Sequence, residues 1–144
     1  MAELYVVGFD GSEGSRRALY VAAQAAHRLR ARLLVVHVIE DSPGADLAPT
    51  APEIAIGQQA AEVEAAHHHL LEPLVAEARD LGVPVELKTL HGDPAAMLAE
   101  LAAFRAASQI FIGRTDHSRL HERLFGSTLT QLARKTTVPV TLVP

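Results

Sequence analysis

The chain of 144 residues contains no cysteine, no tryptophan, two tyrosines and four phenylalanines. Without cysteine it has no disulfide framework, no thiol nucleophile and no thiolate metal site. Lysine and arginine together number 13 against 17 aspartates and glutamates, which gives a formal net charge of −4. Generic nucleic-acid binding requires a basic face, so we expect no nucleic-acid partner.

Long hydrophobic runs are also missing. No apolar stretch approaches the roughly 18 residues that a membrane helix needs, and we expect no membrane partner. The chain opens on Leu4–Phe9 with no basic, apolar and small-residue signal sequence before it, so we expect a cytoplasmic protein. A content of 49% hydrophobic and 21% charged residues is typical of a globular chain. We expect one domain over residues 1–144.

Five short apolar runs have the length and composition of β-strands. They are Leu4–Phe9, Leu33–Ile39, Val85–Leu90, Ser108–Gly113 and Val140–Val143. The third run alternates apolar and polar residues, as a half-exposed strand at a sheet edge does. Helical periodicity fills the intervals, over Ser15–Arg30, over Glu53–Leu81, from Pro94 onward and over Ser127–Lys135. Each crossover is long enough for a parallel βαβ unit, so we predict an α/β fold: an open, doubly wound five-stranded parallel sheet with helices on both faces.

In such sheets, ligands bind beyond the carboxyl ends of the strands, where the strand order reverses. The first strand ends at Asp10 and the fourth at Gly113. If these two strands are neighbours at the reversal, then Asp10, the end of the second strand near Val38, and the connection from Gly113 to Ser127 line one crevice. This convergence is the main argument for a site.

The connection after Ile112 has the composition of a phosphate-binding segment. A glycine where a strand ends lets backbone approach a bound group, and Gly126 and Ser127 place amides at a helix N-terminus, which favours an anion. Many strand–helix connections contain glycine without binding anything. No P-loop motif and no G-x-S-x-G nucleophile elbow is present, and we identify no positioned base for an efficient hydrolase.

Several local patterns allow more than one interpretation. His37 lies within a strand and is expected to be a hydrogen-bonded core or edge histidine. Three consecutive histidines, 67–69, point about 100° apart on a helix and cannot converge on one ion, so a solvated face is expected. His117 and His121 stand at i, i+4 beside Asp116, which is a weak metal pattern, and no metal site is predicted.

Two further segments carry structural expectations. Pro73 lies inside the second helical stretch, where it removes a backbone hydrogen bond and predicts a kink or a break. The longest loop spans Asp41–Pro52 and is either a lid over a ligand or a simple surface loop.

The sequence resembles the universal stress protein family along essentially its whole length. Four segments carry the resemblance: Val7–Ser12 with Ala18–Ala22 for the first strand and helix, His37–Ile39 for the end of the second strand, Gly92–Pro94 for the turn after the third, and Val138–Val140 for the last strand. ATP-binding members carry G-x-x-G-x9-G-[ST]. This chain has Gly113, then Asp116 in place of the second glycine, then Gly126 and Ser127 at the family's spacing.

The resemblance implies a Rossmann-like fold of the adenine nucleotide alpha hydrolase-like type. It also implies binding of ATP, or of AMP or ADP, with Mg²⁺ as a candidate companion ion, and a homodimer formed through the C-terminal strand, Val140–Val143. By similarity, Asp10 would contact the nucleoside and the backbone of Val38 the adenine, while Gly113, Gly126 and Ser127 would hold ribose and phosphates. The full set of implied cofactor-binding residues is Gly8, Phe9, Asp10, Val38, Ile112, Gly113, Arg114, Asp116, Gly126, Ser127 and Thr128.

Asp116 separates two functional hypotheses. A carboxylate about 5 Å from a phosphate costs roughly 1 to 3 kcal/mol, and each 1.4 kcal/mol is about tenfold in affinity. Arg114, Arg119 and Arg123 in the same connection, or Mg²⁺, would offset this cost. The first hypothesis is an adenine-nucleotide-binding protein of stress response and signalling. The alternative is an interaction module of the same fold in which Asp116 excludes phosphate; a slow ATPase is a weaker third.

Overall fold

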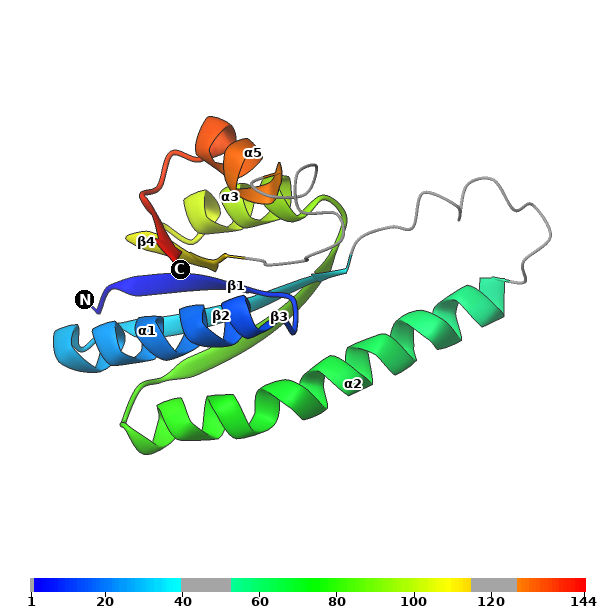
Figure 1. The fold of residues 1–144 in the computed structure, drawn as a ribbon, viewed down its shortest axis with the longest axis horizontal. Helices are drawn as coiled ribbons and strands as arrows, with labels where there is room; N and C mark the ends of the chain where they lie inside the picture. Colours follow the sequence, from blue (N-terminus) through cyan, green and yellow to red (C-terminus); the bar gives the residue numbers. More distant parts are fainter. Residues whose placement is uncertain (1, 40–52, 115–126) are drawn as a thin grey trace.

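The sheet has five strands, all parallel. The computed structural model describes residues 2–39, 53–114 and 127–144. The strands are β1 (Leu4–Phe9), β2 (Arg32–Ile39), β3 (Val85–His91), β4 (Gln109–Gly113) and β5 (Val140–Val143). Their order across the sheet is β3-β2-β1-β4-β5 (Figure 1). The predicted five-stranded parallel sheet is confirmed, with β3 at one edge as its alternating pattern indicated.

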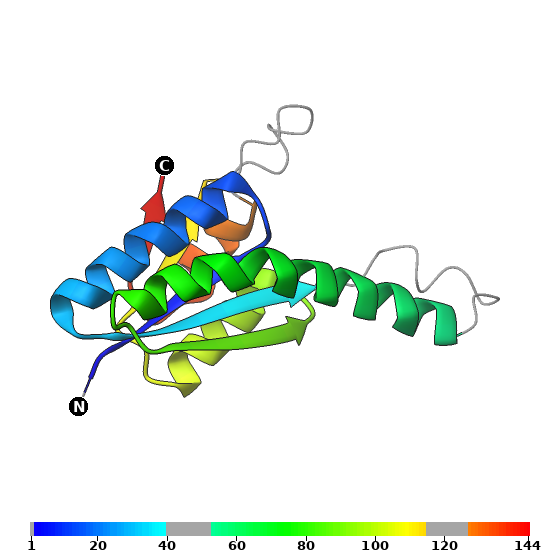
Figure 2. The ribbon, with the colours of Figure 1, turned by 90° about the horizontal axis from the view of Figure 1, so that it is seen from below.

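Helices cover both faces of this sheet, as predicted. They are α1 (Glu13–Leu29), α2 (Glu53–Asp80), α3 (Pro94–Phe104) and α5 (Ser127–Lys135). Helices α1 and α2 lie side by side on one face, and α3 and α5 lie on the other (Figures 1 and 2). No helix in the described ranges is both long and apolar enough to cross a membrane.

Strand β1 is buried on both faces, which is why its sequence is an almost continuous apolar run. Tyr5, Val7 and Phe9 face α1 and α2, whereas Leu4 and Val6 face α3 and α5. The ring of Tyr5 packs on a neighbouring strand against Phe111, with the ring centroids 5.4 Å apart. Full burial of a large apolar side chain contributes about 1.5–3 kcal/mol, so β1 is the centre of both cores.

Helix α1 packs closely on the sheet because its buried face is made of small side chains. Ala18, Ala22 and Ala26 recur at helical spacing and are completely buried. The helix begins at Glu13, two residues before the predicted start, and ends at Leu29 with Arg30 as a left-handed C-cap.

Of the kink or break predicted at Pro73, the break is wrong, because α2 is one helix from Glu53 to Asp80 with Pro73 inside it; the kink stays a prediction. A proline within a helix costs about 3 kcal/mol. Leu71 and Val75 on either side of Pro73 are buried in the core below, and their burial offsets that cost. His68 and His69 are exposed on this helix, the solvated face that was predicted.

His37 is buried in β2, and the loop Asp41–Pro52 lies outside the described residues.

One ion pair joins β3 to the end of α3. The Arg105 guanidinium donates to both carboxylate oxygens of Glu86, at 3.1 and 2.8 Å. This hydrogen bonding holds the pKa of Glu86 below its ordinary value of 4.5 and raises the pKa of Arg105. A lowered carboxyl pKa in the folded state means that the stabilisation is present above the unfolded pKa and is lost as the pH falls through the folded pKa.

We therefore expect Glu86→Gln to lower the free energy of unfolding at pH 7 by at most about 1 kcal/mol, since the pair is half exposed. Urea unfolding measured at pH 7 and again below the pKa of Glu86 should show the difference from wild type disappear in acid. Glu13→Gln is the control, because Glu13 makes only a long, exposed contact of 3.9 Å with Arg17. A loss that persists unchanged in acid would contradict the assignment.

Candidate functional site

The strand order reverses between β1 and β4, which are direct neighbours as predicted. The register of β1 with β2 continues to the pair Phe9 and His37, at the end of β1. The register of β1 with β4 already ends at the pair Val7 and Phe111. The last two residues of β1 are thus paired on one side only. The switch point, where ligands of such sheets bind, lies between the end of β1 and the end of β4.

The backbone of Val38 is directed toward this switch point. In a parallel ladder, successive residues direct their amide and carbonyl to opposite neighbours. The N–H of Arg32 donates to the Glu3 carbonyl, beside β1, and the N–H of Leu33 donates to the Pro84 carbonyl, beside β3. By this alternation Val38 faces β1, one residue beyond the last β1–β2 pair. Its carbonyl therefore points where β1 has ended and a ligand can replace the strand.

Asp10 follows β1 directly and is exposed. Its Oδ1 accepts the N–H of Ser12 at 2.9 Å, across a turn in which Gly11 has a φ of 85°. The second oxygen, Oδ2, makes no hydrogen bond to any part of the chain that the structure describes. One half of the carboxylate therefore fixes the turn, and the other half is available for a hydroxyl or amine donor.

The same turn begins α1. The Ser12 side chain accepts the N–H of Ser15 at 3.1 Å, and the Ser15 hydroxyl donates to the Ser12 carbonyl at 2.8 Å. This is an N-cap with a reciprocal bond, an arrangement that is worth about 0.5–2 kcal/mol. It explains why α1 starts at Glu13 and not at the predicted Ser15.

The first turn of α1 presses against the end of β4, backbone on backbone. A Cβ added to Gly113 would lie 2.0 Å from the carbonyl oxygen of Gly14, and a Cβ added to Gly14 would lie 1.9 Å from the carbonyl oxygen of Arg114. Any side chain at either position would collide with atoms that cannot move aside. The sequence reasoning expected Gly113 to admit a bound group; the structure shows α1 on the side where its Cβ would stand.

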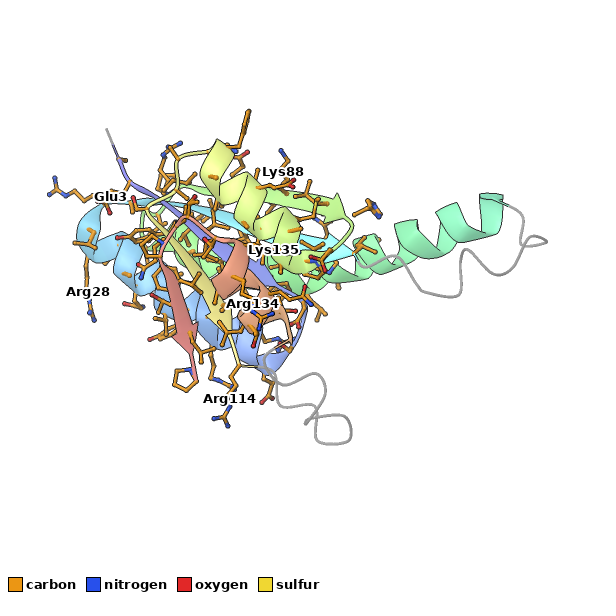
Figure 3. All side chains as sticks on the ribbon, turned by 90° about the horizontal axis from the view of Figure 1, so that it is seen from above. Glu3, Arg28, Lys88, Arg114, Arg134 and Lys135 are labelled. Atoms are coloured by element: carbon orange, nitrogen blue, oxygen red, sulfur yellow. The ribbon has the colours of Figure 1, made fainter. Side chains whose placement is uncertain are left out.

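Gly8, Phe9 and Ile112 are turned toward the cores. A Cβ on Gly8 would meet Leu98 of α3 at 3.1 Å, Phe9 is buried, and Ile112 packs partly buried against the α3 side. By the alternation along each strand, the backbone of Gly8 faces β4, that of Phe9 faces β2 and that of Ile112 faces β5. Arg114 is exposed at the end of β4, with its side chain directed away from the sheet (Figure 3). Its N–H donates to the Val143 carbonyl at 2.9 Å.

The remaining predicted site residues follow β4 in sequence. Ser127 and Thr128 open α5, which packs on α3 and whose Lys135 lies 3.5 Å from the Asp93 carboxylate. Asp116 and Gly126 lie outside the described residues, as do Arg119, Arg123, His117 and His121. The structure thus brings together the ends of β1, β2 and β4, and the contribution of residues 115–126 stays a prediction.

Sequence reasoning missed Gly14. Gly8, Gly11 and Gly14 have the spacing G-x-x-G-x-x-G, which does not match the dinucleotide fingerprint G-x-G-x-x-G. The available signal was a glycine inside the first turn of a helix, where alanine is more favourable by about 1 kcal/mol. A residue that opposes local propensity often answers a tertiary requirement, and here the requirement is the approach of β4.

The turn at Asp10 gives a testable distinction between shape and charge. Asp10→Ala removes the acceptor for the Ser12 N–H, so we expect it to lower the free energy of unfolding by about 1 kcal/mol. Asp10→Asn keeps an acceptor oxygen in the same place, and we expect it to lose less than half as much. Chemical unfolding of the two variants beside the wild type measures this difference. Equal losses would mean that the Ser12 bond contributes nothing.

Comparison with known proteins agrees with the motifs in the sequence. The family model described as the universal stress protein family matches residues 2–144. Two proteins of Bacillus subtilis (strain 168) are each 29% identical: the stress response protein NhaX, with 99% of this chain and 98% of the relative covered, and the universal stress protein YxiE, with 96% of each covered. A solved universal stress protein in complex with cAMP is 25% identical, with 99% of this chain and 96% of that chain covered and a TM-score of 0.70. The chain belongs to the universal stress protein family.

Proposed function

We propose that this protein binds an adenine nucleotide, ATP, at the β1–β4 switch point. We further propose that it acts in stress response and signalling, and that its activity there depends on whether nucleotide is bound. The observation that carries the proposal is the position of Val38 and Asp10 at the ends of two adjacent strands. Each offers a polar group that the sheet does not use. The related universal stress protein solved with cAMP supports the same ligand class.

Each end of the nucleotide would meet a different part of the site. The Val38 carbonyl would accept a hydrogen bond from the polar edge of adenine, because β1 has ended where this carbonyl points. Asp10 Oδ2 would accept from a ribose hydroxyl. Gly113, Gly126, Ser127 and Thr128 form the predicted phosphate end, where amides at the start of α5 favour an anion. We propose no catalytic residue, and at most slow hydrolysis.

The predicted phosphate end contains side chains of both charges, the Arg114 guanidinium and the Asp116 carboxylate. The Arg114 guanidinium, exposed where β4 ends, suits a phosphate oxygen. The carboxylate of Asp116 opposes it, unless Mg²⁺ bridges the carboxylate and the phosphates; oxygen ligands of these types suit that ion. We propose Mg-ATP as the form that relieves the repulsion.

A second copy of the chain is the proposed protein partner. Strand β5 is an edge, paired with β4 alone among the described strands, and Leu142 on it is 41% exposed. Exposed apolar edges invite pairing with another chain. A homodimer across β5 would cover this edge in the symmetric way that most oligomers use. We place the protein in the cytoplasm, as the sequence predicts.

Nucleotide binding can be tested on the purified protein. With no tryptophan and two tyrosines, the chain absorbs weakly near 280 nm, so bound nucleotide would appear as a peak near 260 nm that is removed by unfolding and filtration. Calorimetric titration with Mg-ATP should then give a dissociation constant in the micromolar range, about −8 kcal/mol. Asp10→Asn should weaken it at least several-fold. A clean spectrum with no heat of ATP binding would overturn the proposal.

The interaction module is the second candidate, and the carboxylate of Asp116 is the observation that favours it. If charge repulsion is the obstacle, Asp116→Gly should tighten ATP binding by about tenfold or more, since the repulsion removed is roughly 1 to 3 kcal/mol. Adenosine, which carries no phosphate, should bind equally to both proteins. An Asp116→Gly variant that still binds no ATP would discard the charge explanation.

A further inference from the structure

The carboxyl end of β4, at Gly113 and Arg114, contacts β5 on one side and α1 on the other. On one side, the Arg114 N–H donates to the Val143 carbonyl of β5 at 2.9 Å. On the other side, the backbone of α1 occupies the space next to Gly113. A Cβ added to Gly113 would lie 2.0 Å from the Gly14 carbonyl oxygen and 2.7 Å from the Ser15 nitrogen. The direction in which the chain leaves the sheet after Gly113 is therefore set by α1 and β5 together.

Hydrogen bonds connect Asp10 to the part of α1 that contacts the end of β4. The carboxylate of Asp10 accepts the Ser12 N–H, and the Ser12 side chain caps the N–H of Ser15. Gly14 lies within this capped turn, directly before Ser15. Ser15 is buried, at 4% exposure, so the first turn of α1 cannot withdraw from the sheet without exposing or unpairing its cap. The nucleoside end and the phosphate end of the proposed site are thus joined by five consecutive residues, 10–14.

We infer that Gly14 is a positioning residue for the phosphate end of the site. It touches no ligand itself. Its missing side chain lets Gly113 and Arg114 lie directly against α1, which fixes where the Arg114 side chain leaves the end of β4. This inference rests on the proposed adenine-nucleotide function.

The backbone around Gly113 supports a steering role over direct contact. The Arg114 amide is already committed to Val143, so it is not a free donor for a phosphate oxygen. Gly113 is instead fully explained by the approach of α1. Gly14 is thus expected to affect phosphate recognition and to leave adenosine recognition nearly unchanged.

The test compares ligands that differ only in their phosphates. In Gly14→Ala, the new Cβ would meet the Arg114 carbonyl oxygen at 1.9 Å, so β4 and α1 must separate at this point. We expect the dissociation constant for ATP to rise by about tenfold or more, while that for adenosine changes less than about threefold. Both are measured by calorimetry on the folded full chain, together with wild type.

A gentler pair of variants covers the case in which Gly14→Ala does not fold. Ser12→Ala removes the N-cap of α1 next to Gly14, and Asp93→Ala removes the equivalent N-cap of α3, where Asp93 accepts the Ala96 N–H at 2.9 Å. Each cap is worth a similar amount to its helix. We expect the ratio of ATP affinity to adenosine affinity to fall several-fold in Ser12→Ala and to stay at the wild-type value in Asp93→Ala. Arg114 amide hydrogen exchange should also be faster in Ser12→Ala.

The outcomes separate the two claims. A wild-type protein that binds neither ATP nor adenosine overturns the proposed function and, with it, this inference. A wild-type protein that binds ATP, with Gly14→Ala or Ser12→Ala losing ATP and adenosine affinity equally, overturns the positioning role alone. A selective loss of ATP affinity in these variants, absent in Asp93→Ala, establishes it.

Discussion

The pairing of β1 with β2 on one side and β4 on the other is the constraint on which the rest of the structure depends. It places the first strand of the chain at the centre of the sheet, buried on both faces. The cores on both faces share β1, and the reversal of strand order falls at its carboxyl end, where Asp10 follows. Stability and the position of the candidate site therefore have the same origin.

Much of the fold is predictable because its signals are local. Apolar runs of strand length mark the five strands, and the alternation in Val85–Leu90 correctly places β3 at an edge. The adjacency of β1 and β4 was a condition of the predicted site, and the strand order confirms it. The start of α1 was two residues off, because either Ser12 or Ser15 can cap a helix. The Asp10 carboxylate decides for Ser12 by holding its N–H, a choice that becomes visible only once the turn is formed.

What the sequence could not reveal is contact between backbones far apart along the chain. Gly14 and Gly113 touch, but glycine has no side chain whose polarity or periodicity would indicate a partner. The break at Pro73 failed for a related reason: the proline rule is local, whereas burial of Leu71 and Val75 is tertiary. The site residues at the ends of β1 and β2 were placed by topology. Those from Asp116 to Gly126 rest on the family motif alone.

Two glycines near the switch point, Gly11 and Gly14, depart from local preference, and they do so in different ways. Gly14 weakens a helix start, by about 1 kcal/mol relative to alanine, to let β4 approach. Gly11 adopts a positive φ, so that Asp10 can reach the Ser12 amide. Both serve the geometry of the site and leave its charge unchanged. The effect predicted for Asp116 is different, because its carboxylate would add a negative charge beside the phosphates of a bound nucleotide. The shape of this edge of the sheet is thus set by Gly11 and Gly14, whereas the charge that Asp116 would add stays a prediction from the family motif.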